Sequence, residues 1–568
     1  MGNATRGRAR ELSDGALLVE YPGASDDAAN QAATALGRDL AERKPSGFLD
    51  AIPGARALLL LYNPLAFERS SLEPLLVGSP ERSATDAQRT VRIPVCYGGD
   101  FGPDLEELSR ERNMSASVLV RRHRDSVYRV AFIGFAPGFG YLLGLPPELH
   151  APRLQSPRTR VPAGSVGIGG PYTGIYPSET PGGWRLIGNS PVRLFDPRRS
   201  PPSLLMPGDR VTFEEIGESE HQRLRESSFV SSASDSASPP VFRVLSPGLF
   251  TSVQGEPRFG LGSSGVPSGG AMDLPSLARA NAALGNDPFE PGLEVTLFGP
   301  RLEVCQGCRI CVAGSEIEAA IDGAPFMNGR ACTVRAGAQL TLGAVRRGAR
   351  AYLAIEGGIE DRSAGLVTRR LDRGDELIRA RERDSQATKA VASRSRTTAS
   401  SGAAGPGASC SAAIKGSRSG HADTRRQPIE SLATDVMARA SPAEEQTVRV
   451  VLGPQEEYFT QAGLSAFLST NYRVSPQSDR RGARLEGARI ELAGPPDIPP
   501  EGTAPGAIQV PGDGLPIVLG PDRPVTGGYA KIATVIGADL PRLGQLRPGT
   551  SIRFRAVSIQ DAIAARRG

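Results

Sequence analysis

A loop-rich segment occurs twice in this sequence, and the repeat limits what the chain can fold into. The first copy spans residues 162–187 (PAGSVGIGGPYTGIYPSETPGGWRLI) and the second spans residues 505–536 (PGAIQVPGDGLPIVLGPDRPVTGGYAKIATVI). Gly164-Ser165-Val166 matches Gly506-Ala507-Ile508, and Thr173-Gly174-Ile175-Tyr176 matches Thr526-Gly527-Gly528-Tyr529. Each copy holds a short β-type run, a cluster of turn residues and another apolar run. The repeat therefore predicts two related β domains in one chain.

Composition supports a β-rich chain with several domains. The 568 residues are enough for about three or four domains of ordinary size. The 67 glycines and 48 prolines stand mostly between short Val, Ile and Leu runs, and such punctuation favours strands and turns over long helices. We therefore expect a β-rich α+β fold.

Charge and hydropathy exclude several classes of protein. The net charge of +5 is small for this length and gives no indication of a nucleic-acid partner. No apolar run approaches the roughly 18 residues of a membrane-spanning helix. The first fifteen residues lack the apolar core of a secretory signal. We expect a cytoplasmic protein that binds neither membrane nor nucleic acid.

The order of apolar runs and polar stretches predicts six regions. They are a small α+β domain (13–90), a β-rich domain (91–216), a Ser-rich linker (217–240), the first part of a second β-rich region (241–378), a disordered insertion (379–446) and a last β domain (447–559). The endings MPGDRVTFEEI and LRPGTSIRFRAV of the two β domains resemble each other, which supports duplication.

Helix signals are few and local. Residues 26–40 predict a helix with Ser25 or Asp26 as its N-cap, between strands over 15–21 and 57–62. A pair of helices is predicted after Pro103-Asp104. Asp273 is a credible N-cap for another helix, because proline follows it at Pro275 in the first turn.

Three cysteines stand in a C-x-x-C-x-x-C pattern. Cys305, Cys308 and Cys311 superficially match a cluster-ligand run, but no fourth cysteine is near and no proline follows the third. The same residues read as a strand with a bend at Gly307. We expect small core side chains there and no metal site.

In the first half, aromatic and arginine residues stand on stiff loops. The loop GFAPGFGYLLGLP sets Phe139 and Tyr141 beside backbone amides, where a planar ligand could bind or the rings could simply pack. Arg153 and Arg158 alternate with prolines, and guanidinium groups on a stiff loop suit carboxylate binding. The alternative is solvated surface arginine.

Two further residues of this half are unusual. His123 stands near Asp125 and is a candidate for proton transfer, with a structural or surface histidine as the alternative. Trp184, the only tryptophan, is either a stacking platform or core filler.

In the second half, polar residues lie within motif-like surroundings. They are Arg258, Asp273, Glu294, Arg480, Arg484 and Lys531. Lys531 could neutralise a carboxylate or a carbonyl oxygen, whereas Asp273 could act in catalysis or only cap its helix. The chain has no phosphate-binding P-loop, no G-x-S-x-G elbow and no biotin-attachment segment.

Several motifs together resemble a known family. GFAPGFGYLLGLP, PRLQSPRTRVPAGSVGIGG and TGIYPSETPGGWRLIG resemble the B subunit of bacterial ATP-dependent 5-oxoprolinase, also called allophanate hydrolase subunit 1. GVPSGGAMD, VLGPQEEYF, the second loop segment and GADLPRLGQLRPG resemble the C subunit of that enzyme, or allophanate hydrolase subunit 2. The resemblance covers most of residues 13–216 and 241–559, as in a fusion of the two subunits.

The resemblance implies a fold and an activity. It implies cyclophilin-like β-barrel domains, one per subunit, with a small N-terminal α+β domain in the B part. It further implies ATP-dependent hydrolysis of 5-oxo-L-proline to L-glutamate with a separate A subunit, using ATP with Mg²⁺ in the assembled complex. Two alternatives stay open: a carboxyltransferase component of a urea carboxylase or urea amidolyase system, and a regulatory module like the family's sporulation-kinase inhibitor. Homo-oligomerisation is also left open.

The motif positions supply candidate site residues. His123, Asp273 and Lys531 are the catalytic candidates. The substrate-binding candidates are Phe139, Tyr141, Arg153, Arg158, Ser165, Thr173, Tyr176, Trp184, Arg258, Arg480, Thr526 and Tyr529.

The C-type half departs from the family pattern. The family's Val-Gln-Asp-x-Gly-Arg becomes Val253-Gln254-Gly255-Glu256-Pro257-Arg258, which loses the aspartate and keeps the arginine. Its Ser-Asp-Arg-Met-Gly-Tyr-Arg-Leu motif retains Arg480 and Arg484 but loses the methionine and the tyrosine. The B-type half is therefore the better preserved one.

Overall fold

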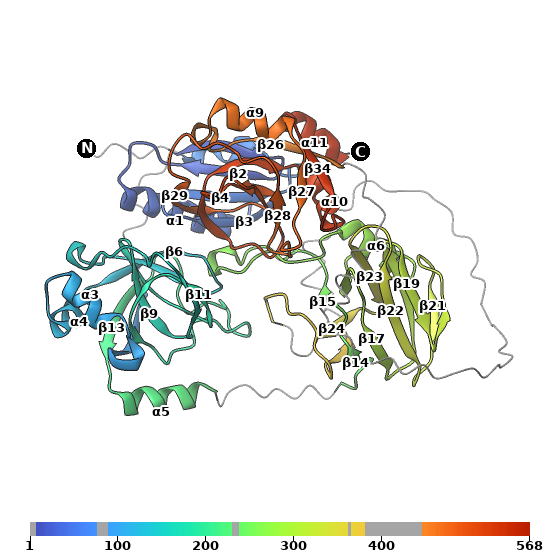
Figure 1. The fold of residues 1–568 in the computed structure, drawn as a ribbon, viewed down its shortest axis with the longest axis horizontal. Helices are drawn as coiled ribbons and strands as arrows, with labels where there is room; N and C mark the ends of the chain where they lie inside the picture. Colours follow the sequence, from blue (N-terminus) through green and yellow to red (C-terminus); the bar gives the residue numbers. More distant parts are fainter. Residues whose placement is uncertain (1–6, 77–88, 230–237, 362–364, 381–445, 568) are drawn as a thin grey trace.

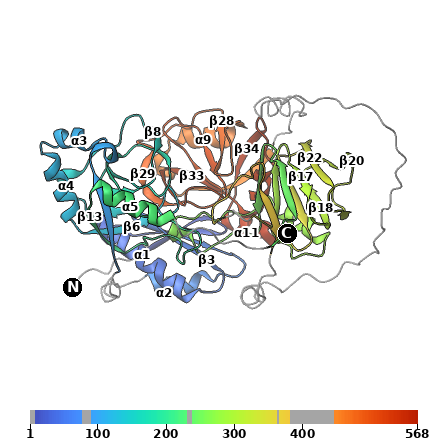
Figure 2. The ribbon, with the colours of Figure 1, turned by 90° about the horizontal axis from the view of Figure 1, so that it is seen from below.

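The computed structural model describes residues 7–76, 89–229, 238–361, 365–380 and 446–567. Figures 1 and 2 show a first β-barrel and a β-sandwich on opposite sides of a central body, which the N-terminal domain and a second β-barrel form together. The predicted disordered insertion lies outside the described residues, except for residues 379, 380 and 446 at its two ends. Among the described residues no helix is long and apolar enough to cross a membrane.

The N-terminal domain is a four-stranded antiparallel sheet with one long helix on one face. Its strands lie in the order β1 (Arg8–Ser13), β2 (Ala16–Glu20), β4 (Ala57–Tyr62) and β3 (Phe48–Pro53), with α1 (Asp26–Arg43) against them. Ser25 caps α1, as predicted, because its Oγ accepts from the Ala28 amide. The domain begins at β1, earlier than the predicted residue 13, because β1 completes the sheet edge beside β2. A short η1 (Arg69–Ser71) and α2 (Glu73–Leu76) follow.

The first barrel contains the B-type motifs. It closes through β5 (Thr90–Tyr97), β12 (Arg185–Asn189), β9 (Ser165–Gly169), β10 (Tyr172–Ile175), β7 (Gly140–Leu143), β6 (Tyr128–Ile133) and β13 (Arg210–Glu215). The remaining elements are η3 (Gly99–Phe101), α3 (Leu105–Glu111), α4 (Ala116–Asp125), η4 (Pro147–Leu149) and an outer pair formed by β8 (Arg158–Val161) and β11 (Thr180–Gly182). Apolar residues that alternate along the strands fill the interior.

The predicted linker over 217–240 is not irregular throughout. Its first half forms α5 (Glu218–Phe229), and His221 of this helix is buried, with its Nε2 2.9 Å from Asn189 Oδ1. The polar composition resembles that of a linker. A helix such as α5, which packs on the protein through one narrow face and exposes the rest, has the same composition.

The β-sandwich contains residues 241–380. One sheet has the order β20 (Ala324–Pro325), β19 (Ile317–Ile321), β22 (Gln339–Val345), β17 (Arg301–Val304), β14 (Phe242–Ser246), β25 (Glu376–Arg379) and β24 (Ile359–Asp361). The other has the order β15 (Phe250–Gln254), β16 (Gly292–Thr296), β23 (Arg350–Ile355), β18 (Cys308–Gly314) and β21 (Cys332–Val334). A large apolar core lies between them. The η5 turn (Gly262–Ser264) and α6 (Leu274–Ala282) lie in the long connection from β15 to β16.

The second barrel repeats the topology of the first. It closes through β26 (Gln446–Leu452), β33 (Lys531–Val535), β30 (Ala507–Gln509), β31 (Ile517–Leu519), β28 (Gly482–Glu486), β27 (Tyr472–Val474) and β34 (Ser551–Ala556). In both barrels the first and last strands pair in parallel, β5 with β13 and β26 with β34. Outside the barrel lie β29 (Asp497–Gly502) and β32 (Thr526–Tyr529), η6 (Glu456–Tyr458), α9 (Gln461–Ser469), η7 (Gly537–Asp539), α10 (Leu540–Gly544) and α11 (Ile559–Arg567).

The matched topologies confirm one half of the sequence repeat and correct the other. Gly164 and Gly506 both precede equivalent strands, β9 and β30, with φ values of 83° and 80°. Thr173, however, lies in β10, whose equivalent is β31, whereas Thr526 begins β32, which pairs with β29 outside the barrel. Strand β32 therefore matches β11, which begins at Thr180 and pairs with β8. The Thr-Gly-x-Tyr match joined two segments with different pairing partners.

The N-terminal domain is joined to the C-type half by a buried seam. The sheet face opposite α1 packs its leucines on Ala504, Leu519 and Val525 of the second barrel. The backbone amide of Ala55 donates to the Pro500 carbonyl at 2.6 Å. Asp50, nearly fully buried, accepts from the amides of Gly260 and Gly262 at 2.9 and 3.0 Å. The B-type and C-type parts thus form one packed body.

Candidate functional site

A pocket of about 430 Å³ opens on the sandwich beside the second barrel. Its wall includes Gln254, Glu256, Arg258, Gly270, Asp361, Thr368 and Arg369. The Val253-to-Arg258 motif begins in the last two residues of β15 and continues into the loop after it, so one wall is the segment in which the sequence departs from the family pattern. Pockets of this size, with a few convergent polar groups, are typical of small-molecule sites.

Backbone geometry shapes the pocket wall. Gly270 has a φ of 84°, and a Cβ built there would lie 2.7 Å from the backbone nitrogen of Pro257. Only glycine fits such a close approach. The Arg258 amide donates to the Ser268 carbonyl at 2.7 Å, which holds the two segments together. The GVPSGGAMD motif is therefore a spacer that sets the position of Arg258.

Arg258 has donors to offer a ligand. Its Nη2 donates to the Leu366 carbonyl at 2.8 Å, and its other guanidinium nitrogens have no hydrogen-bond partner among the described residues. Arg369, by contrast, is held by Asp361 at 2.6 Å and by Asp375 at 2.7 Å. Of these two arginines, Arg258 is therefore the one with donors left for an anion.

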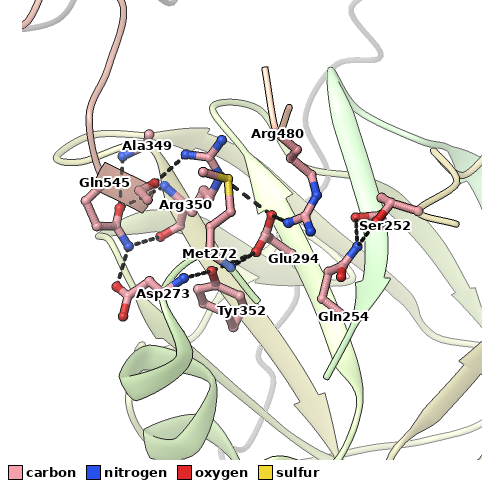
Figure 3. A network of polar contacts seen from close by, with 12 residues as sticks. Ser252, Gln254, Met272, Asp273, Glu294, Ala349, Arg350, Tyr352, Arg480 and Gln545 are labelled. Carbon is pink, nitrogen blue, oxygen red and sulfur yellow. Dashed lines mark hydrogen bonds and ion pairs between the residues drawn. The ribbon is translucent and has the colours of Figure 1, made fainter. Parts of the chain in front are cut away.

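A chain of polar contacts leads from the pocket into the protein, and Figure 3 shows its buried end around Glu294. The Gln254 amide donates to Ser252 at 3.0 Å and to Thr368 at 3.2 Å, and the Thr368 hydroxyl donates to Asp522 at 3.0 Å. Asp522 also accepts from Arg480 Nε at 2.7 Å. Arg480 in turn pairs with Glu294 at 2.5 Å.

Glu294 is the buried end of this chain. Burial alone would raise its pKa, but Arg480 and Arg350, with hydrogen bonds from the Met272 amide and the Tyr352 hydroxyl, hold its pKa below the ordinary value. A buried carboxylate with several cationic and hydrogen-bonding partners stays ionised. The network therefore fixes Arg480 and Asp522 rigidly behind the pocket.

Asp273 lies beside this network and caps a helix. Its carboxylate accepts from the Ser276 amide at 3.1 Å and the Ser276 hydroxyl at 2.5 Å, at the start of α6. Gln545 of the second barrel donates to the same carboxylate at 2.7 Å. Asp273 therefore has the helix-cap role that the sequence offered as the alternative to catalysis, and it also ties the sandwich to the second barrel.

The aromatic candidates of the first half form one cluster. Phe139, Tyr141, Tyr176 and Trp184 are buried and pack edge to face, with ring centroids 5.1 to 5.5 Å apart. Burial raises the pKa of the Tyr141 hydroxyl to about 12, and exposed Arg153 opposes part of that rise. The neighbouring Phe135 has a φ of 65°, a strained value that marks this loop as a second candidate for function.

His123 is enclosed in the first barrel. It is fully buried and stacks on Phe213 at 4.6 Å, while Asp125 is bonded to Arg124 instead. Its Nδ1 lies 2.9 Å from the Tyr97 hydroxyl and its Nε2 lies 2.9 Å from Thr173 Oγ1. Burial lowers its pKa to about 3. The expected carboxylate neighbour is therefore absent among the described contacts of His123, and Thr173 is its partner in the core.

The remaining candidates of the first half have structural partners. Arg158 pairs with buried Asp104 at 2.5 Å. Ser165 begins β9, and its carbonyl accepts from the amide of Tyr176 at 2.9 Å. These contacts hold the loops of the first barrel in place.

Apart from Arg480, the site candidates of the second barrel lie away from the pocket. Lys531 is fully buried and forms an ion pair with Glu501 at 2.5 Å, and Gln455 donates to the same carboxylate at 2.7 Å. Thr526 lies directly against Gly134 of the first barrel, where no side chain would fit. Tyr529 is 41% exposed. Thr526 therefore lies at a contact between the two barrels.

No metal site is apparent among the residues that the structure describes, since they contain no group of three His, Cys, Asp or Glu side chains placed to hold an ion. Cys308 and Cys311 lie in β18, and burial raises the pKa of each thiol to about 11. Cys308 and Cys311 are therefore core residues of the sandwich. Cys305 is half-buried and lies between β17 and β18, so the segment forms two strands in different sheets, and the expected single strand with a bend at Gly307 is wrong.

Sequence reasoning missed several residues of the network. Asp522, Thr368, Arg350, Tyr352 and Gln545 were given no role, although Asp522 stands in the second loop segment and Gln545 in the GADLPRLGQLRPG motif. The motif context was a signal for these two. Thr368 and Arg350 come from segments with no such signal, and only the packing of the sandwich on the second barrel brings them together.

Two family models match the chain. "Carboxyltransferase domain, subdomain C and D" matches residues 7–205, and "Carboxyltransferase domain, subdomain A and B" matches residues 264–556. The N-terminal part is 39% identical to the B subunit of 5-oxoprolinase from Bacillus subtilis (strain 168), covering 38% of this chain and 96% of that protein. The C-terminal part is 30% identical to the C subunit of 5-oxoprolinase from Escherichia coli (strain K12), covering 57% of this chain and 94% of that protein.

One solved structure is similar over nearly the whole chain, and a larger protein is similar over part of it. The crystal structure of a protein named TTHA0988 is similar over 96% of this chain and 100% of that chain, with 31% identity and a TM-score of 0.72. Urea amidolyase of Lachancea kluyveri is 30% identical over 57% of this chain, but the match covers only 17% of that larger protein.

Proposed function

Because the chain belongs to the carboxyltransferase-domain family that includes the B and C subunits of 5-oxoprolinase, we propose that it is a fused B and C component of that ATP-dependent enzyme. With a separate A-type subunit it opens 5-oxo-L-proline to L-glutamate, in the cytoplasm. ATP with Mg²⁺ serves the assembled complex, and this chain carries no biotin of its own.

The observation that carries the proposal is the joining of both relatives in one packed body. Each relative is covered almost completely, and the two parts meet in the buried seam at Asp50. Two modules joined only by a tether would not need to share a buried carboxyl group. A buried carboxyl group without hydrogen-bond partners is costly, so Asp50 of the B-type part depends on the amides of the C-type part. The seam supports a single working unit.

The chemistry suits the pocket at Arg258. A lactam resists water because its carbonyl is stabilised by resonance, so its opening needs activation. Transfer of the ATP γ-phosphoryl group to the lactam oxygen, addition of water to the carbonyl carbon, cleavage of the ring C–N bond and release of phosphate give glutamate, ADP and phosphate. In this scheme Arg258 binds the substrate carboxylate through its free guanidinium nitrogens.

The test is glutamate release from 5-oxoproline with ATP, with and without the A-type subunit. We expect turnover only with both components. Arg258→Met should lower kcat/KM about 10- to 100-fold, mostly through KM, because one charged hydrogen-bonded contact is lost. Arg258→Lys should keep part of the affinity.

The control is Arg335→Met, which removes an exposed arginine of the same half that pairs at the surface with Asp322. This variant should keep wild-type kinetics. An Arg258→Met enzyme with unchanged KM would remove Arg258 from substrate binding, and absence of turnover with both components would contradict the proposed function itself.

The urea amidolyase match favours a second candidate function. In that case the chain is the carboxyltransferase component of a biotin-dependent system, and a separate biotinylated carrier supplies the carboxyl group to urea or another amide. Urea-dependent decarboxylation of the carboxylated carrier, without 5-oxoproline turnover, would select this function.

A further inference from the structure

A second, larger groove of about 590 Å³ lies where the N-terminal domain, the sandwich and the second barrel meet. Its lining is mostly apolar and includes Leu49, Leu65, Phe259, Leu274, Leu519 and Leu543. Asp50, beside Leu49, makes the seam contact with Gly260 and Gly262, so the groove continues the seam to the surface. It is separate from the aromatic cluster of the first barrel.

The groove is composite. Leu49 and Leu65 come from the N-terminal domain of the B-type part, Phe259 comes from the sandwich, and Leu519 and Leu543 come from the second barrel. Neither part alone carries all its walls. In relatives where the B and C parts are separate chains, the equivalent surface would exist only after the two had assembled.

Two apolar side chains remain exposed at this groove. Leu65 is 53% and Phe259 is 36% exposed, and they are among the few large apolar side chains left exposed in the described part of the chain. They are distant in the sequence and belong to different parts of the fusion. Exposed apolar groups that gather around one hollow are typical of protein-binding surfaces.

We propose that this groove docks an apolar segment of the A-type subunit, and the inference rests on the proposed function. A partner that contacts all walls of this groove binds only when the B and C parts are assembled. Glu256 lines both this groove and the Arg258 pocket, because Gly255-Glu256-Pro257 forms the partition between them. A segment docked in the groove therefore lies next to the substrate site.

The test is the affinity of the purified full-length chain for the A-type subunit, measured by titration calorimetry. Leu65→Asp/Phe259→Asp should weaken binding at least 30-fold, because the new charged groups must be desolvated when the partner docks. Leu65→Ala/Phe259→Ala removes only apolar contact and should weaken binding about 3- to 10-fold. The matched control is Val127→Asp/Met327→Asp, which changes two exposed apolar residues elsewhere. Thermal unfolding checks that every variant is folded.

The outcomes separate the two proposals. If the wild-type chain does not bind the A-type subunit at all, the proposed function fails, and the docking inference fails with it. If the wild type binds and both groove variants bind equally well, only the groove is overturned. A control pair that weakens binding as much as the groove pair would also overturn it. Arg258→Met should keep the affinity for the A-type subunit while its KM for 5-oxoproline rises, which separates docking from substrate binding.

Discussion

At the scale of single residues, His123 is a reactive side chain whose two ring nitrogens are both used in hydrogen bonds inside the first barrel. The Thr173 hydroxyl donates its one proton to the Gly167 carbonyl at 3.0 Å, so it accepts from His123 Nε2. His123 Nδ1 then accepts from the Tyr97 hydroxyl. Both ring nitrogens are used and the neutral tautomer is set. We propose a structural role for His123 in place of proton transfer.

His123 should make the first barrel sensitive to acid. Because burial lowers its folded pKa to about 3, its contribution is complete above its unfolded pKa, near 6.5, and is lost as pH falls toward 3. The free energy of unfolding should fall by about 2 kcal/mol between pH 7 and pH 5 from this group alone.

The measurement uses ¹³C-labelled histidine, because the chain has only four histidines and His123→Gln assigns the signal. The His123 resonance should not titrate above about pH 4, and the His123→Gln variant should lose part of the acid sensitivity. A midpoint near its ordinary pKa of about 6.5 would show that His123 is accessible and would revive the proton-transfer hypothesis.

At the scale of elements, α6 is positioned by one carboxylate that satisfies three donors. Asp273 serves the Ser276 amide and hydroxyl and the Gln545 side chain. The sequence predicted the cap from Asp273 and Pro275, since both residue types favour a helix start. The sequence could not predict the hydrogen bond from Gln545, because this residue belongs to the second barrel and meets Asp273 only after folding.

Asp273→Ala should lower the free energy of unfolding of the C-type half by about 1 to 3 kcal/mol, because a cap is lost and the buried Ser276 hydroxyl loses its acceptor. Asp273→Asn retains a capping oxygen and should cost less. Denaturant titration measures both. Equal, negligible losses would mean that Gln545 and Ser276 find other partners.

The two loop segments show a limit of pattern matching at the same scale. Thr526 and Thr173 share a four-residue pattern but belong to non-equivalent strands, β32 and β10. A short motif in turn-rich sequence carries little information about which strands pair, whereas pairing order defines the barrel. The match of Gly164 with Gly506 held because a left-handed residue is required before each equivalent strand.

At the scale of the whole molecule, the seam predicts that the two parts remain together after the chain is cut. A protease site inserted after Phe229 separates the B-type part from the C-type part. The halves should co-elute in size-exclusion chromatography, because the apolar face of the N-terminal sheet and Asp50 stay buried on the C-type half.

Asp50→Ala should weaken this association about 10- to 100-fold, since the amides of Gly260 and Gly262 lose their carboxyl acceptor. Asp39→Ala, at an exposed aspartate of α1 paired with Arg43, is the control and should leave association unchanged. Dissociation of the unmutated halves at micromolar concentration would show that the covalent link, rather than the seam, holds them together.

The sequence by itself determined the β-rich class, two related β domains, the N-caps at Ser25 and Asp273 and, through its motifs, the family whose fold implied barrels. These follow from local signals: turn residues, short apolar runs and motifs that each occupy one stretch of chain. It also placed Arg258 and Arg480 among the site candidates. Only the tertiary structure decided that Arg258 keeps free donors while Arg158, Lys531 and Arg480 are paired. Whether a charge is free depends on partners that folding brings from distant segments, and no local pattern records them.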